Sequence, residues 1–329
     1  MWQSPVTTIG VTGATGFIAG ALIPALAADG HELLLVDDRS GPTTVERPEF
    51  PVPKADFASE ASLDRLSASD LILHLAAISG VMACAQEPAA SARVNIEGTR
   101  RLYAMCLREK IPVAFASSFA VVGAPESLPV TERTPARPTH EYARQKAAGE
   151  LLTQELAEKG KFGTAVLRQS NVYGFYMAGE RRVTKSNVLE MFARQIPSGR
   201  LRVNAPGTQR RDFIHILDVV AHWQAAVRWL VGRGASAPAA TFSVASGEAF
   251  SVLELADRVV RSVPRLRPDL PVPVAEIVPN PREGIELIEP GFSIDPAETE
   301  RVLSVRCAHR LDDELPGILG GRRDPLPRP

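Results

Sequence analysis

A tyrosine and a lysine stand four residues apart, as Tyr142 and Lys146 in the segment YARQK. In a helix this spacing places both side chains on one face. A free phenol has a pKa of about 10 and is a poor base at neutral pH, but a nearby ammonium group stabilises its phenolate. Tyr142 could therefore accept and return a proton. The alternative is an ordinary exposed helix, because this spacing is common by chance.

A serine hydroxyl follows the apolar run at 113–117, which reads as a strand. Ligands of open parallel sheets bind at the C-terminal ends of the strands, where Ser118 stands. Its hydroxyl could share a proton with Tyr142. Ser118, Tyr142 and Lys146 are thus the predicted catalytic residues.

A glycine-rich turn lies between a short apolar run and a helix-like segment, at 12–20. Gly13 would permit the tight turn, Gly16 would let the backbone approach a pyrophosphate, and the helix N-terminus would supply free N–H groups. Ala19 stands where a third glycine is usual, at a position that controls only helix packing. Taken alone, such a turn often binds nothing.

Acidic residues downstream of the turn strengthen the prediction of a dinucleotide site. Asp37 ends the second predicted strand, at the distance expected for a carboxylate that binds the adenosine ribose. An acid there repels a 2′-phosphate, so NAD is favoured over NADP. The alternative for Asp37 is a solvated strand end. Asp56 could reach the adenine amino group or could cap the helix ahead of Ser59.

Short apolar runs alternate with longer helix-like segments, a pattern typical of crossover units and a parallel sheet. The sequence predicts an α/β fold, a Rossmann-type doubly wound parallel sheet of at least five strands with a smaller C-terminal substrate lobe. Strands are expected at 6–11, 33–37, 71–76, 113–117, 164–168 and 242–245, and helices at 17–28, 91–109 and 142–159.

Composition excludes several classes of partner. The chain has 329 residues, of which 45% are hydrophobic, and a formal net charge of −1, so no basic field attracts nucleic acid. Its three cysteines lack the paired spacing of disulfide or metal sites, and no metal is implied. No leader or membrane-spanning run is evident, so a cytoplasmic protein is expected, without membrane partners.

These motifs together resemble the extended short-chain dehydrogenase/reductase superfamily, in its NAD-dependent epimerase/dehydratase branch. The resemblance covers nearly the whole chain and includes, in order, the segments 12–19, 74–77, 95–99, 118, 142–146, 167–174, 211–216 and 242–248. It implies that the cofactor NAD contacts Gly13, Thr15, Gly16, Phe17, Ile18, Asp37, Asp56, Leu75, Ala76, Ala77, Asn95, Ser117, Tyr142 and Lys146. His74 is expected to be a satisfied buried residue.

The resemblance also implies a nucleotide-sugar substrate, with a UDP-sugar the commonest in the branch. It implies substrate contacts from Ser118, Tyr142, Asn171, Asn187, Arg211 and Arg282. Two of these, Arg211 and Arg282, resemble a diphosphate clamp, which suits the paired donors of arginine. The alternative for Arg282, in a proline-rich loop, is plain solvation.

The matched residues imply a reaction in which Tyr142 takes a proton from a sugar hydroxyl while the ring carbon gives hydride to NAD. Return of hydride to the opposite face of the keto-sugar would give the epimer. Dehydratases and decarboxylases of the branch carry acidic residues just after the catalytic serine or threonine, where this chain has Phe119 and Ala120. A 4-epimerase is therefore expected, with a reductase or dehydratase as alternatives and a non-catalytic dinucleotide sensor less favoured.

The expected domains follow the same resemblance. Residues 1–174 form the NAD-binding domain, to which 212–245 return, residues 175–211 and 246–320 form the substrate lobe, and 321–329 form a flexible tail. The helices at 91–109 and 142–159 carry small and apolar residues on more than one face, so a homodimer is expected.

Overall fold

The computed structural model describes residues 7–41, 44–234, 237–281, 284 and 291–320. The expected tail at 321–329 lies outside this part of the chain. Among the described helices, none combines the length and apolar character needed to cross a membrane.

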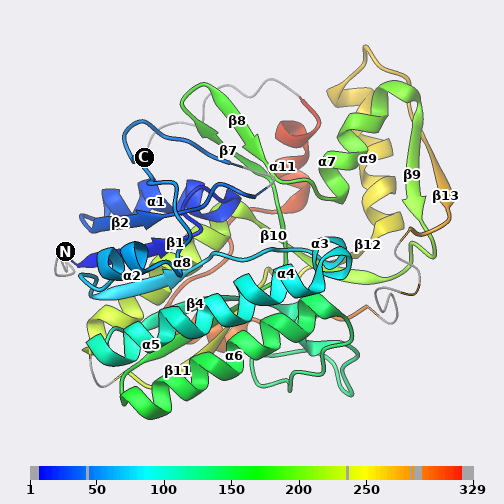
Figure 1. Cartoon of the computed structure of the whole chain (residues 1–329). Helices are drawn as coiled ribbons and strands as arrows, with labels where there is room; N and C mark the ends of the chain where they lie inside the picture. The colour runs from blue at the N-terminus through cyan, green and yellow to red at the C-terminus, as the bar shows by residue number, and fades with distance from the viewer. Residues whose placement is uncertain (1–6, 42–43, 235–236, 282–283, 285–290, 321–329) are drawn as a thin grey trace.

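Six parallel strands form the central sheet (Figure 1), and the predicted Rossmann-type α/β fold is confirmed. The strand order is β11-β5-β4-β3-β1-β2. A parallel sheet buried on both faces requires strands that are almost wholly apolar, and these runs meet that requirement. The strands are β1 (Thr8–Thr12), β2 (Glu32–Val36), β3 (Leu71–His74), β4 (Val113–Ser118), β5 (Thr164–Gln169) and β11 (Ala239–Val244).

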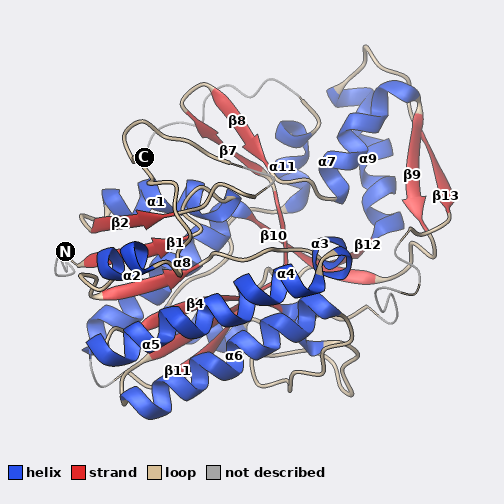
Figure 2. Cartoon of the chain, viewed as in Figure 1, coloured by secondary structure: helices blue, strands red, loops and turns tan. Residues whose placement is uncertain are grey.

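Helices cover both faces of the sheet (Figure 2). On one face α1 (Phe17–Ala28) and α8 (Ile216–Arg233) pack on each other and on alternate residues of the strands. On the other face the strands pack against α2 (Glu60–Leu66), α5 (Thr99–Glu109) and α6 (Glu141–Gly160). Two separate apolar cores result, one on each side of the sheet.

The helix expected at 91–109 is not one regular α-helix. It consists of α4 (Pro88–Ala92), a π-helical turn (Arg93–Gly98) and α5. Such π-turns insert an extra residue into the helix and are frequent at functional sites. Ahead of them lies the short helix α3 (Val81–Gln86).

A second, smaller group of elements follows β5. Its core lies between α7 (Val188–Gln195), α9 (Val252–Leu266) and α11 (Leu311–Ile318). Its strands form three small sheets: β12 (Ala249–Ser251), β10 (Arg210–His215) and β6 (Asn171–Tyr173); β13 (Val274–Val278) and β9 (Arg200–Asn204); and the hairpin β7 (Phe175–Ala178) and β8 (Arg181–Thr184).

The sequence predicts a return of the chain to the NAD-binding domain over residues 212–245, and the first residues of this segment do not join the central sheet. Residues 212–215 belong to β10, which pairs with β6 and β12 and not with the central sheet. The return is made by α8, and β11 then adds to the sheet beside β5. The division into domains stays a prediction.

The β7–β8 hairpin is attached to the first turns of α1. The hydroxyl of Tyr176 donates to the carbonyl oxygen of Phe17 at 2.8 Å. A Cβ at Gly20 would lie 2.4 Å from that hydroxyl oxygen, so the close approach needs glycine. Arg47 joins the same two elements, because its guanidinium donates to the carbonyl oxygens of Gly20 and Met177, at 3.0 and 3.2 Å.

Candidate active site

The structure brings the three predicted catalytic residues together at the C-terminal end of β4. His140 caps α6, its Nδ1 accepting from the N–H of Ala143 at 3.3 Å, and so starts the helix that carries Tyr142 and Lys146. The hydroxyls of Ser118 and Ser79 adjoin the phenol of Tyr142, and both lower its pKa. The buried ammonium group of Lys146 donates to the carbonyl oxygen of Ala116, at 2.7 Å.

Burial controls the ionisation of this group. It raises the pKa of Tyr142 above the usual value of a phenol, and the hydroxyls of Ser79 and Ser118 act in the opposite direction. Burial, with a smaller contribution from the charge of Lys185, lowers the pKa of Lys146 to about 8. Without a bound cation the phenol is therefore protonated at neutral pH, and Lys146 still carries its proton.

The depressed pKa of Lys146 predicts a stability that increases with pH. The folded protein releases this proton at about pH 8 and the unfolded chain at 10.5, so the unfolded state binds more protons between these values. Relative to Lys146→Met, the wild type should gain about 1–3 kcal/mol of unfolding free energy from pH 7.5 to 10. Urea titrations of both proteins measure this, and an equal pH dependence in the two would contradict it.

The glycine turn is built as the sequence predicts. Gly13 has a φ of +69°, and a Cβ there would lie 2.7 Å from the backbone nitrogen of Ala76. Gly16 begins α1 without any side-chain cap, so the first N–H groups of this 12-residue helix are free for an anion. The carboxylate of Asp37 accepts from the N–H of Thr15 at 3.0 Å and thus lies beside the turn. This donor set fits the pyrophosphate of a dinucleotide.

Gly13→Ala is expected to lower the affinity for NAD at least tenfold and to destabilise the protein by more than about 2 kcal/mol. The new methyl group would add a steric contact with Ala76 to the strain of a positive φ. Gly30→Ala is the matched control, since Gly30 has a φ of +88° and open space around it. Calorimetry and thermal unfolding check this, and equal effects of the two changes would contradict it.

The opposite wall of the predicted cofactor site follows β3. The buried imidazole of His74 lies between the hydroxyls of Thr12 and Thr99, at 2.7 and 2.9 Å. Burial lowers the pKa of His74 to about 3, so the ring is neutral. The hydroxyl of Thr12 also accepts from the N–H of Ala76 at 3.3 Å, and this network fixes the segment Leu75-Ala76-Ala77 beside Gly13. The expectation of a satisfied buried histidine is confirmed.

Three other predicted cofactor residues bond within the protein. The amide of Asn95 bridges the backbone of Ile78, accepting at 2.8 Å and donating at 2.9 Å. The hydroxyl of Ser117 donates to Glu150 at 2.5 Å. Asp56 is exposed and accepts from the N–H of Ala58 at 2.8 Å. A contact of each with the cofactor stays a prediction.

A cavity of about 110 Å³ opens beside Ser118, and two further predicted substrate residues, Asn171 and Arg211, line it. Asn171 lies on β6, where its amide donates to the carbonyl oxygen of Asp212 at 3.0 Å. Arg211 lies on β10, its guanidinium 5.8 Å from the ring centre of Phe292. The residues that line the cavity are Ser118, Phe119, Ala120, Gly123, Thr139, His140, Gln169, Ser170, Asn171, Arg211, Asp212, Phe292 and Ile294.

Asn187, another predicted substrate residue, does not line this cavity, and neither does Tyr142, which adjoins Ser118. Asn187 caps α7, its side-chain oxygen accepting from the N–H groups of Leu189 and Glu190 at 2.9 and 3.1 Å. Arg282 lies outside the described residues. Their contacts with substrate stay predictions.

A buried ion pair lies next to β4, the strand that ends at Ser118. Arg168 on β5 and Glu150 on α6 form two hydrogen bonds, of 2.9 and 2.8 Å, with side chains only 7% and 12% exposed. Glu150 also accepts from Ser117 on β4, and its charge raises the pKa of Lys146. The pair thus joins β4, β5 and α6, two of which carry the predicted catalytic residues.

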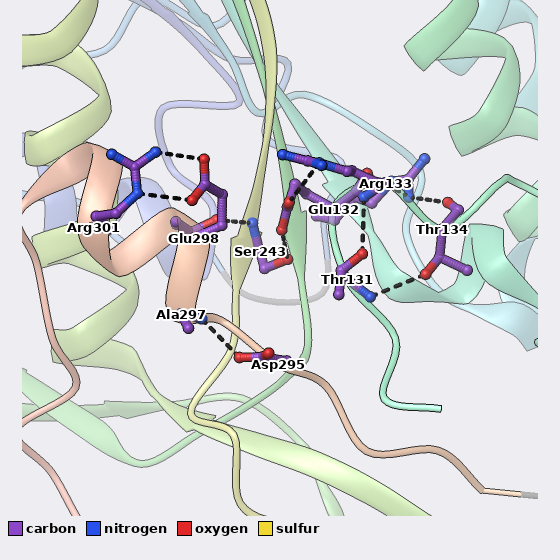
Figure 3. A network of polar contacts seen from close by, with 11 residues as sticks. Thr131, Glu132, Arg133, Thr134, Ser243, Asp295, Ala297, Glu298 and Arg301 are labelled. Carbon is purple, nitrogen blue, oxygen red and sulfur yellow. Dashed lines mark hydrogen bonds and ion pairs between the residues drawn. The ribbon is translucent and has the colours of Figure 1, made fainter. Parts of the chain in front are cut away.

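The loop after β4 is bound to this pair and to the far edge of the sheet. Arg168 donates to the carbonyl oxygen of Thr134 at 2.7 Å. Figure 3 shows the neighbouring network, in which Glu132 faces Ser243 of β11 and Asp295 lies ahead of α10 (Ala297–Leu303). These contacts hold the loop against β5 and β11.

The sequence profile described as the NAD dependent epimerase/dehydratase family matches residues 9–234. The chain belongs to this family. The predicted resemblance and the cofactor NAD are therefore confirmed. The matched segment contains the glycine turn, Ser118, Tyr142 and Lys146, and it ends with α8.

Relatives in this family include an epimerase and a dehydratase. The UDP-glucose 4-epimerase of Mycolicibacterium smegmatis is 30% identical over 265 residues, covering 77% of this chain and 82% of the relative. The structure of MoeE5 in complex with UDP-glucose and NAD is 26% identical, with a TM-score of 0.76 and coverage of 94% of this chain and 96% of that one. TunA, an NAD dependent NDP-hexosamine 5,6-dehydratase, is 27% identical, with a TM-score of 0.77 and coverage of 95% and 96%.

Several residues of this family member were missed by sequence reasoning. Ser79 lowers the pKa of Tyr142 and follows Ala76 and Ala77 by three and two positions, a spacing that could have identified it. Gln169 and Phe292 line the cavity without belonging to any motif that the sequence displays. Only the packing of distant segments brings them to the site.

Proposed function

We propose that the chain is a nucleotide-sugar 4-epimerase that acts on a UDP-sugar through a keto-sugar. The observation that carries this proposal is the proximity of Tyr142 to Ser118, which lines a cavity together with Asn171 and Arg211. An acid–base pair thus adjoins groups suited to a sugar and a diphosphate. The likeness to the M. smegmatis UDP-glucose 4-epimerase supports the same assignment.

The chain's own residues would move one proton in each half of the reaction. As phenolate, Tyr142 accepts the proton of the sugar hydroxyl, and Ser118 hydrogen-bonds to the same oxygen. Lys146 carries the positive charge that lowers the cost of forming the phenolate. Bound NAD supplies the hydride acceptor and donor. Tyr142 then returns the proton to the carbonyl oxygen after the sugar has turned its other face, and no net oxidation occurs.

The composition of the cavity favours epimerisation over loss of water. Phe119 and Ala120 follow Ser118, where an acidic pair would serve a dehydratase. Asp212 is the single acid among the described residues that line the cavity. Its carboxylate accepts from the N–H and the hydroxyl of Ser246, both at 3.1 Å, and so secures the turn after β11.

The test is incubation of the purified protein with UDP-glucose, UDP-galactose, their N-acetyl forms and the UDP-uronates. Interconversion of a C4 pair without added reductant, followed by NMR, is the expected result. Conversion that requires added NADH or NADPH would make the protein a reductase. An unsaturated or deoxygenated product would make it a dehydratase, as TunA is described.

A homodimer through α5 and α6 stays part of the proposal. These helices lie side by side on one face of the sheet (Figure 1). Leu151 on α6 is 62% exposed, which is unusual for a large apolar side chain and suits a contact between subunits.

A further inference from the structure

One side chain of the cavity, that of Gln169, has a buried amide oxygen without a partner among the described residues. Gln169 ends β5, directly across from Ser118 in the register of β4 and β5. Neighbouring parallel strands lie about 4.8 Å apart and paired residues point to the same side of the sheet, so the amide lies next to the catalytic hydroxyl. Gln169 is only 7% exposed, yet it lines the cavity.

The amide oxygen of Gln169 accepts no hydrogen bond from any described residue. Its neighbour Asn171 differs, because the amide of Asn171 donates to the backbone carbonyl of Asp212. Buried polar atoms are almost always paired, so an orphan at a ligand cavity indicates a partner that the ligand provides. The hydroxyl of Ser170 is a second such atom at this cavity, whereas others, such as the indole nitrogen of Trp223, lie in the packed core.

We propose that Gln169 is a specificity-determining residue whose amide binds a sugar hydroxyl beside the reacting carbon. This inference rests on the proposed function. Ser118 holds the reacting oxygen, and Gln169, one strand away, is in position for an adjacent hydroxyl. A hydroxyl both donates and accepts, so it satisfies either end of the amide.

The opposite wall of the cavity suits the same ligand. Phe292 and Ile294 offer an apolar surface to the C–H face of a sugar ring. Their segment is fixed, since Val130 exchanges two backbone hydrogen bonds with it, to Ser293 and Asp295, each of 2.8 Å. The sugar would thus lie between an apolar wall and the polar pair Ser118 and Gln169.

The test compares Gln169→Met with the matched control Gln154→Met in the NAD-bound protein. Gln154 is exposed on α6 and bonds only to Glu158, at 3.0 Å, among the described residues. For Gln169→Met we expect UDP-glucose to bind about tenfold more weakly, UDP to bind unchanged, and the melting temperature without substrate to stay or rise. Gln154→Met should change neither affinity.

The melting temperature separates ligand binding from a structural role. A lower melting temperature with an unchanged ratio of UDP-glucose to UDP affinity would assign Gln169 to the fold and overturn the proposal. Loss of NAD with that ratio unchanged would assign the amide to the nicotinamide and also overturn it. These readouts need no turnover, so they remain valid if the epimerase assignment fails but nucleotide sugars bind.

UDP-sugars that lack one hydroxyl identify the contact. Removing the partner hydroxyl should weaken binding to the wild type but not to Gln169→Met, a non-additivity that marks a direct interaction. Additive losses for every hydroxyl would overturn the inference alone. If no nucleotide sugar binds the wild type, the proposed function fails and this inference fails with it.

Discussion

Tyr142→Phe is expected to lower the rate of nucleotide-sugar epimerisation about 10²- to 10⁴-fold, the usual contribution of a positioned acid–base group. The ring remains in place, so NAD should stay bound and substrate affinity should change little. Only the oxygen that exchanges a proton with the sugar is lost, and Ser118 cannot replace it because a hydroxyl is a far weaker acid than a phenol. Turnover by NMR and bound NAD after denaturation measure the two effects.

Tyr103→Phe is the matched control for this change. Tyr103 is buried, and its hydroxyl bonds to Thr153 at 3.0 Å, between α5 and α6. We expect a loss of about 1 kcal/mol of stability and unchanged turnover. Turnover within tenfold of the wild type for Tyr142→Phe would show that the phenol is not the base.

Arg168→Met is expected to lower the free energy of unfolding by about 3–5 kcal/mol, because it leaves the carboxylate of Glu150 buried without its partner. The loss is large since both side chains are nearly inaccessible. The uncompensated negative charge should also raise the pKa of Lys146, which Glu150 already raises. Urea unfolding measures the first effect, and NMR titration of the lysine measures the second.

Two further variants make this prediction specific. Arg133 is 83% exposed and only loosely paired with Glu132, at 3.7 Å, so Arg133→Met should change stability by less than about 0.5 kcal/mol. The double change Glu150→Leu with Arg168→Met should recover much of the loss, because no buried charge is left alone. A loss below about 1 kcal/mol for Arg168→Met would show that water reaches Glu150.

The parts of the fold and site that could be predicted are those encoded by short segments. The turn around Gly13 depends on local backbone freedom, and the spacing of Tyr142 and Lys146 depends only on helical periodicity. The strands can be recognised as apolar runs in the sequence because both faces of the sheet are buried. Each of these signals lies within about 20 residues.

The parts that could not be predicted depend on distant neighbours. The segment that contains Lys54 pairs with Asp37 through a single bridge only. Pro51 and Pro53 have no N–H groups, so a longer ladder cannot form there. Ser117 and Ser118 are adjacent in sequence, but the first donates to Glu150, whereas the second accepts from the N–H of Ala120 and adjoins Tyr142. The missing partner of Gln169 is a property of the packed cavity and leaves no trace in composition or period.

The attachment of the β7–β8 hairpin to α1 has a mechanical consequence. The hydroxyl of Tyr176 and the guanidinium of Arg47 join the hairpin to the turn of helix that is built to receive the phosphates of the cofactor. A displacement of the hairpin therefore pulls on that turn. Movement of the hairpin and movement of the first turns of α1 are therefore coupled through these three hydrogen bonds.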